Sequence, residues 1–267
     1  MGRSVIFIVL MAMTDFSLVL LYPFSAARFF LTASIFGPGT CLVLYLLFHP
    51  RNQWLVKNRW RVDSHGRRCV ALTFDDGPHP VSTPKLLDIL QEKGVSATFF
   101  VIGERAERYP DIVRRAQAEG HLVGNHTWSH PSFFCFLTPS RLRSEIERGS
   151  EAIQRICGYR PCYFRSPVGL RHALLGPYLR DEGLEYLSWR IRTRDTFGPK
   201  AGVLVSRIVN KAAAGDIILL HDNSRAGARP MLEAIPQVID RLRSQGFEFV
   251  LPDAVPVAGA STARCAL

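Results

Sequence analysis

Short apolar runs alternate with amphipathic segments between residues 69 and 251, and this alternation constrains the fold more than any other feature of the chain. The apolar runs predict strands at residues 69–74, 97–102, 121–124, 163–165, 184–188, 217–221 and 248–251. The segments between them predict helices at residues 82–94, 110–119, 138–157, 174–181, 203–214 and 231–245. Such alternation is typical of parallel α/β folds, in which helices cover a parallel sheet. The pattern alone does not distinguish an open sheet from a closed barrel.

Two adjacent carboxylates, Asp75 and Asp76, follow the first predicted strand, and Gly77-Pro78 then breaks it. Like charges at the end of a buried strand resist joint ionisation, so a bound cation or a division of roles between them would relieve the cost. The alternative is that Asp-Asp-Gly is ordinary turn chemistry.

A second polar cluster, Gly124 to His130, favours the metal interpretation. Its histidines, His126 and His130, are spaced i and i+4, which predicts that they lie on one face of a helical turn. With one carboxylate they form a set of three protein ligands. Such a set leaves a coordination position open for water, as catalytic zinc sites do.

Three further motifs follow in order: residues 164–169 (FRSPVG), residues 189–195 (WRIRTRD) and residues 217–222 (IILLHD). With these five motifs the chain resembles the polysaccharide deacetylase family, also called carbohydrate esterase family four, whose catalytic unit is the NodB homology domain. The resemblance covers roughly residues 68–252. It implies a distorted (β/α)7 barrel related to the TIM barrel, with the chemistry at the carboxyl ends of the strands.

The resemblance also implies a metal site and a base. Asp76, His126 and His130 would bind a divalent metal ion, and zinc is the expected ion. Asp75 would be the general base that removes a proton from metal-bound water.

Three residues of the later motifs would complete the machinery that the resemblance implies. Arg165 would pair with Asp75. His221 would be the general acid that protonates the departing amine, and Asp195 would orient His221.

The chain departs from the family's pattern in two places. Val168 stands where an aromatic residue is common in the third motif. In the fourth motif Arg192 replaces the first aspartate and the usual tryptophan is missing, while Trp189 lies six residues before Asp195. We therefore expect the acid–base pair to survive and the sugar-contacting wall to differ.

The N-terminal region contains two apolar stretches, residues 5–22 and 29–48, each long enough to cross a bilayer as a helix. They predict a membrane anchor, in its simplest form a helical hairpin. A secretory signal peptide with a cleavage site near residues 25–27 is the alternative. The expected organisation is an anchor at 1–50, a basic juxtamembrane linker at 51–67, a catalytic domain at 68–252 and a tail at 253–267.

The net charge of +10 does not predict nucleic-acid binding, because much of the excess follows the second apolar stretch and no basic stripe interleaved with aromatic residues occurs elsewhere. Basic residues beside a membrane segment are typical of the cytoplasmic side. We therefore expect a membrane-bound protein with its catalytic domain facing the cytoplasm; an exported orientation is the alternative. The six cysteines lack metal-type spacing and read as mostly free thiols, and only Cys157 and Cys162 are candidates for a bridge.

These observations predict a membrane-associated, zinc-dependent hydrolase that removes an acetyl or formyl group from an amino sugar. Its substrate would be a polysaccharide, a glycolipid or a lipid-linked glycan, and membrane lipid would be the other partner; no protein partner is predicted. An O-acetyl esterase and a catalytically silent glycan-binding protein are the alternatives. The apolar residues 133–137 after His130 would pack inward or contact lipid.

Overall fold

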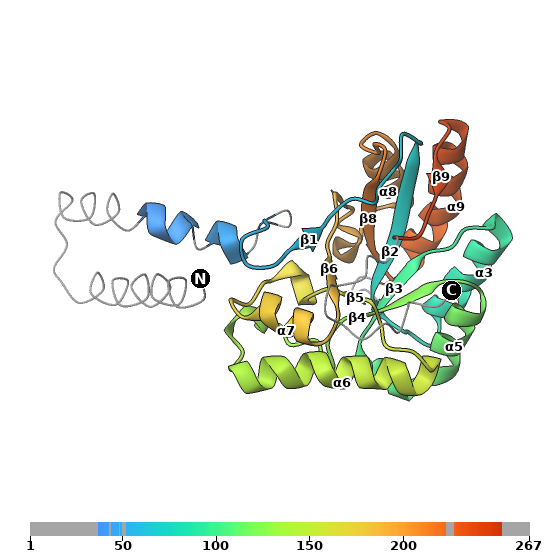
Figure 1. Cartoon of the computed structure of the whole chain (residues 1–267). Coiled ribbons are helices and arrows are strands. Elements are labelled where there is room, and N and C mark those ends of the chain that lie inside the picture. The colour runs from blue at the N-terminus through green and yellow to red at the C-terminus, as the bar shows by residue number, and fades with distance from the viewer. Residues whose placement is uncertain (1–36, 43, 48, 50–51, 223–226, 253–267) are drawn as a thin grey trace.

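A computed structural model describes residues 37–42, 44–47, 49, 52–222 and 227–252. In this part of the chain the strands form one curled parallel sheet, and the helices lie outside it (Figure 1). The strands are β1 (Asn58–Arg59), β2 (Cys69–Gly77), β3 (Thr98–Val101), β4 (Leu122–Asn125), β5 (Tyr163–Phe164), β6 (Glu185–Leu187), β7 (Ile191–Arg192), β8 (Asp216–His221) and β9 (Glu248–Phe249).

The sheet order is β1-β6-β5-β4-β3-β2-β8-β7, with β9 paired to the start of β2, and every strand pair is parallel. This confirms the predicted parallel α/β arrangement. The path runs from β1 to β7, and among the described residues these two edges do not pair with each other. The distorted (β/α)7 barrel that the resemblance implied is therefore seen as a curled parallel half-barrel. A single antiparallel bridge between Arg61 and Asp216 links the segment after β1 to β8.

The helices connect the strands in the predicted order and cover the outer face of the sheet. They are α3 (Ser82–Lys93), α4 (Gly103–Arg108), α5 (Pro110–Ala118), α6 (Pro139–Cys157), α7 (Leu175–Asp181), α8 (Ala201–Val209) and α9 (Arg229–Ser244), with short 3-10 turns η1 (Phe134–Phe136), η2 (Pro167–Gly169) and η3 (Asp195–Phe197). Their ends follow local chemistry. Helix α3 stops at Gly94 in the left-handed conformation, and α6 begins after Thr138, whose side chain accepts a hydrogen bond from the Arg141 N–H.

Strand β2 shows how the sequence positions the site. Its side chains alternate between two apolar clusters, as a pleated strand requires. Val70, Leu72 and Phe74 pack outward against the helices, while Cys69 and Ala71 face the interior of the half-barrel. Continuing this alternation places Asp75 on the interior face, at the carboxyl end of the strand.

The segment preceding β2 is packed against the rest of the domain. Residues 37–42 and 44–47 are helical, and Leu46 and Leu47 are buried against a cluster that includes Phe134 and Phe164. Strand β1 pairs with β6. Residues 52–62 therefore join the fold before the predicted start of the catalytic domain at residue 68.

The basic residues of this segment mostly face acidic partners. Arg59 lies 2.8 Å from Glu185, Arg61 lies 3.0 Å from Asp216, and Arg67 lies 3.3 Å from Glu248. These partners are distant in sequence, so the local charge pattern could not reveal them. The pairs weaken the interpretation of this cluster as a surface for anionic lipid headgroups.

The predicted membrane anchor falls largely outside the described residues: the first apolar stretch lies wholly there and the second in part. Among the residues that the structure describes, no helix has the length and apolar character needed to cross a bilayer. Cys157, one of the two candidates for a bridge, is a free thiol, as are Cys41, Cys69 and Cys135.

Candidate active site

The two adjacent carboxylates diverge because β2 is irregular at its end. The register between β2 and β3 shifts between Asp75 and Gly77, so Asp76 forms a bulge and adopts a positive φ of 71°. A bulge re-aims a side chain, and positive φ is uncommon for a residue other than glycine. Asp75 thus points into the half-barrel, and Asp76 turns toward the loop after β4.

That loop carries the two histidines, and it is not the helical turn that the i, i+4 spacing predicted. Residues 126–130 follow β4 as an irregular loop. The Asn125 side chain accepts a hydrogen bond from the Thr127 N–H at 2.7 Å, and both Thr127 and His130 have positive φ values. A side chain that bonds to the backbone two residues on favours a turn over a helix, which explains the difference.

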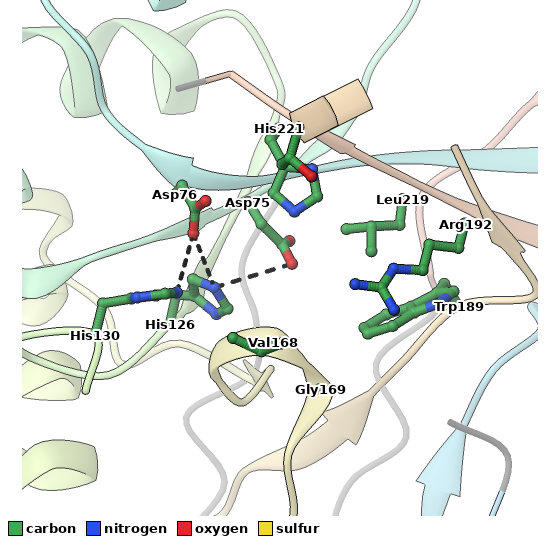
Figure 2. Close-up of a pocket in the computed structure, with 11 residues that line it drawn as sticks. Asp75, Asp76, His126, His130, Val168, Gly169, Trp189, Arg192, Leu219 and His221 are labelled. Carbon is green, nitrogen blue, oxygen red and sulfur yellow. Dashed lines mark ion pairs between the residues drawn. The ribbon is translucent and has the colours of Figure 1, made fainter. Parts of the chain in front are cut away.

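Asp76, His126 and His130 nevertheless converge on one point, as the sequence predicted. Their ligand atoms all lie within 4.8 Å of one another. Asp76 Oδ1 lies 3.4 Å from His126 Nε2 and 3.1 Å from His130 Nε2 (Figure 2). Two atoms that each lie about 2.1 Å from one ion at a tetrahedral angle are about 3.4 Å apart. The three residues therefore fit a single divalent ion.

The charge state of the triad suits a metal ligand set. Burial alone would raise the pKa of Asp76, but hydrogen bonds from His126 and His130 hold it well below its usual range. His126 Nδ1 lies 2.8 Å from the carbonyl oxygen of Arg165. Because that carbonyl can only accept, Nδ1 carries a hydrogen, so a bound ion that displaces the Nε2 hydrogen would find Nε2 as its ligand atom.

Arg165 is fully buried and ties Asp75 to the interior of the half-barrel. Its Nη1 donates to Asp75 Oδ1 at 2.7 Å and to the Thr73 hydroxyl at 2.8 Å. Its Nε and Nη2 donate to the carbonyl oxygens of Leu187 and Ser188. The guanidinium also lies 4.2 Å from the centroid of the Phe100 ring. These contacts fix both the charge and the orientation of Asp75.

His221 ends β8 directly beside Asp75 in the sheet register. Its Nδ1 lies 2.8 Å from Asp195 Oδ1, and its backbone N–H donates to Asp195 Oδ2 at 2.7 Å. Burial lowers the pKa of His221, but the hydrogen bond and charge of Asp195 and the charges of Asp75 and Asp76 raise it to about 9. His221 is therefore an imidazolium at neutral pH.

All seven predicted site residues thus lie together: five of them line a cavity of about 130 Å³, and Arg165 and Asp195 support Asp75 and His221. Figure 2 shows Asp75 between the metal-type triad and a second wall formed by Trp189, Leu219 and Arg192. The sequence had placed Trp189 too early for its motif, yet its ring packs against Gly169, where a Cβ atom would lie 2.5 Å from it. Close approach of the tryptophan therefore requires glycine at this position.

The rim of the cavity carries Val168, where an aromatic residue was expected. It is 57% exposed and has a positive φ of 57°, which is unusual for a β-branched residue. The exposed apolar residues Phe133 and Phe136 belong to the loop after His130, while Phe134 and Cys135 are buried. Inward packing is confirmed for Phe134 and Cys135, and contact of the outward-facing residues with lipid stays a prediction.

Reasoning from the sequence assigned no role to Asp222, which the structure buries completely beside the site. Its Oδ2 accepts a hydrogen bond from the Thr83 hydroxyl at 2.5 Å, and its Oδ1 has no hydrogen-bond partner among the described residues. The carboxylate packs on Gly77, where any side chain would collide with it. Burial raises the pKa of Asp222 to about 7. Only the position of Asp222 directly after His221 could have suggested this neighbourhood.

Comparison with known proteins agrees with this geometry. The family model described as polysaccharide deacetylase matches residues 63–187. A peptidoglycan-N-acetylglucosamine deacetylase of Bacillus cereus is 36% identical over 183 residues, covering 68% of this chain and 66% of the relative. A chitooligosaccharide deacetylase of Azorhizobium caulinodans is 35% identical over 199 residues, covering 69% and 92%.

A solved structure supports the same assignment. The crystal structure of the Bc1960 peptidoglycan N-acetylglucosamine deacetylase is 33% identical and superimposes with a TM-score of 0.68, covering 72% of this chain and 89% of that chain. The matching relatives are named as deacetylases of acetylated glycans. The chain therefore belongs to the polysaccharide deacetylase family of hydrolases.

Proposed function

We propose that the protein is a metal-dependent N-deacylase that removes an acetyl or formyl group from an amino sugar of a glycan. The observation that carries the proposal is the convergence of Asp76, His126 and His130 with Asp75 on one side and His221 on the other. The deacetylation of peptidoglycan and chitooligosaccharides by named relatives supports the substrate class.

The proposed metal site uses two imidazole nitrogens and one carboxylate oxygen. This donor set suits zinc and leaves room for water and substrate. A bound divalent ion would polarise the acyl carbonyl and make water more acidic. The hydrogen bond from His126 Nδ1 to the Arg165 carbonyl keeps the ring in the tautomer that can bind the ion through Nε2.

The protein's own groups supply the proton transfers. Asp75, paired with Arg165, accepts a proton from the attacking water. His221, held as an imidazolium by Asp195, donates a proton to the departing amine nitrogen. An amide nitrogen is a poor leaving group unless it is protonated, so the reaction needs both groups. Their adjacent places on β2 and β8 put a base and an acid on the same cavity.

The proposal is tested by measuring acetate release from N-acetylglucosamine oligomers by the full chain, after metal removal by a chelator and again after zinc return. We expect release that depends on zinc and falls at least a hundredfold in Asp75→Asn and His126→Ala, since each removes a group central to the mechanism.

Exposed residues provide matched controls. Asp63→Asn and His65→Ala make the same chemical changes at solvent-exposed positions, and we expect them to retain full activity. A protein that binds one zinc ion and yet releases no acyl group from any N-acyl sugar would instead be a silent glycan-binding protein. Failure to bind a divalent ion would reject the mechanism.

We further propose that residues 1–50 anchor the enzyme in a membrane. The two apolar stretches of the sequence support this. A topology reporter fused after Leu267 tests the predicted inward orientation. A reporter that is active only in the cytoplasm supports it, and an exported reporter rejects it.

A further inference from the structure

Arg192 is a charged residue of the cavity wall to which the proposed mechanism gives no role. It ends β7 and pairs in register with Leu219 of β8, so it lies two positions before the level of His221. Its side chain lines the cavity and is exposed to solvent. Figure 2 shows Arg192 across the cavity from His126 and His130, with its guanidinium directed inward above Trp189.

The other charged residues of the cavity have partners of opposite charge within the protein. Asp75 pairs with Arg165, His221 pairs with Asp195, and Asp76 contacts both histidines of the triad. Arg192 forms no ion pair and no side-chain hydrogen bond in the described part of the chain. A guanidinium has five donors in a planar fork that matches carboxylate and phosphate oxygens. Its position on a substrate-binding wall therefore favours an anionic partner from the substrate.

The reacting groups indicate which part of the substrate would carry this anion. Asp75, His221 and the metal-type triad line the cavity, so the acyl amide must reach them there. The sugar ring that carries the acyl group then lies beside it, toward the mouth of the cavity. Arg192 is exposed at that mouth, so it faces substituents of the ring.

From this we propose that Arg192 is a specificity-determining residue that binds an anionic substituent, a carboxylate or a phosphate, on the sugar bearing the N-acyl group. The inference deepens the proposed function and rests on it. Binding of an anion accounts for Arg192 at a position where the family often has an aspartate. Arginine in place of aspartate reverses the charge that the wall presents to the substrate.

The test compares three N-acetylated substrates with the zinc-loaded full chain: an N-acetylglucosamine oligomer, an N-acetylmuramic acid derivative bearing a free carboxylate, and N-acetylglucosamine 1-phosphate. We expect kcat/KM to be about tenfold or more higher for at least one acidic substrate than for the neutral one, because hydrogen bonds between charged groups are strong. The acidic substrate that is preferred identifies the source of the anion.

Arg192→Gln should reduce the ratio of acidic to neutral kcat/KM about tenfold, mainly through KM. It should also remove the increase of KM with salt that an exposed charge pair produces. Arg190→Gln is the matched control, since Arg190 is exposed, carries the same charge two residues earlier and does not line the cavity. It should leave the ratio unchanged.

Failure of this inference and failure of the proposed function give different results. Hydrolysis of the neutral substrate with no acidic preference would overturn this inference and leave the proposed function standing. An acidic preference that persists in Arg192→Gln, or that falls equally in Arg190→Gln, would also overturn it. If none of the three substrates is hydrolysed, the proposed function fails and this inference fails with it.

Discussion

Replacing Asp195 by asparagine tests how the protein keeps its proposed general acid protonated. Asp195 accepts three hydrogen bonds in the structure: His221 Nδ1 at 2.8 Å, the His221 backbone N–H at 2.7 Å and the Thr193 hydroxyl at 3.0 Å. Asparagine removes the negative charge and offers one acceptor oxygen in place of two. At least one of these donors therefore loses its partner.

The magnitude follows from the environment of His221. Burial lowers its pKa, and the hydrogen bond and charge of Asp195 lead the contributions that raise it from 6.5 to about 9. At about 1.4 kcal/mol per pKa unit, the net preference for the imidazolium is about 3 kcal/mol. Asp75 and Asp76 remain in the variant, so we expect the pKa of His221 to fall by roughly one to two units.

The sign of the effect on activity is set by the role of His221. A general acid works only when it is protonated, so activity declines as pH rises through its pKa. Asp195→Asn should therefore move the alkaline limb of the kcat/KM profile to lower pH by the same one to two units. A bound divalent ion adds the same positive charge to both proteins, so the measured quantity is the difference between them.

The assay is acyl release by zinc-saturated enzyme across the pH range from about 6 to 10, with Asp63→Asn as the exposed-carboxylate control. A kcat/KM profile whose maximum falls while its alkaline limb stays at the same pH would refute the reasoning. It would mean that Asp195 orients the imidazole without setting its protonation.

Three other predictions concern the buried groups. Arg165→Met should lower the free energy of unfolding, measured by urea denaturation, by about 3–5 kcal/mol, because Asp75 becomes an unpaired buried carboxylate; a loss below about 1 kcal/mol would contradict this. The raised pKa of Asp222 adds stability that is fully present below pH 4 and is lost as pH rises through about 7. In metal-free protein the free energy of unfolding should therefore fall by about 1 kcal/mol per pH unit between pH 5 and 7. Asp222→Asn should flatten this slope, and an unchanged slope would refute the reasoning. Chelation should lower the thermal midpoint of the wild type but not of His126→Ala, and equal shifts in both would place the stabilising metal elsewhere.

Much of the fold was predictable because its signals are local. Helix α3 ends at Gly94 and α6 begins after Thr138, where the sequence places the expected capping residues. The strands β1 (Asn58–Arg59) and β7 (Ile191–Arg192) were not predicted, because both lie among basic and polar residues that form no apolar run. They exist because longer neighbours, β6 and β8, offer them backbone partners.

The candidate site was predictable in composition but not in backbone geometry. The ordered motifs identified the residues that converge, since strand ends of a parallel sheet meet at one edge. The bulge at Asp76 and the loop at His126 depend on contacts made by the folded chain. One of these is the hydrogen bond between His126 Nδ1 and the carbonyl oxygen of Arg165, which lies 39 residues away in the sequence. For the same reason, the pattern of charges along the sequence did not predict the ion pair between Arg59 and Glu185.

The two walls of the cavity differ in how firmly their side chains are held, and this separates chemistry from recognition. Asp75, His221 and His126 each have a hydrogen-bond partner within 2.8 Å that fixes their orientation, as proton transfer and metal binding require. Arg192 and Val168, the two departures from the family's pattern, are exposed and lie on the opposite wall and the rim. Changes confined to groups that touch only the sugar alter which substrate binds while the reacting groups keep their positions. We therefore expect the altered motifs to have changed the substrate and to have preserved the reaction.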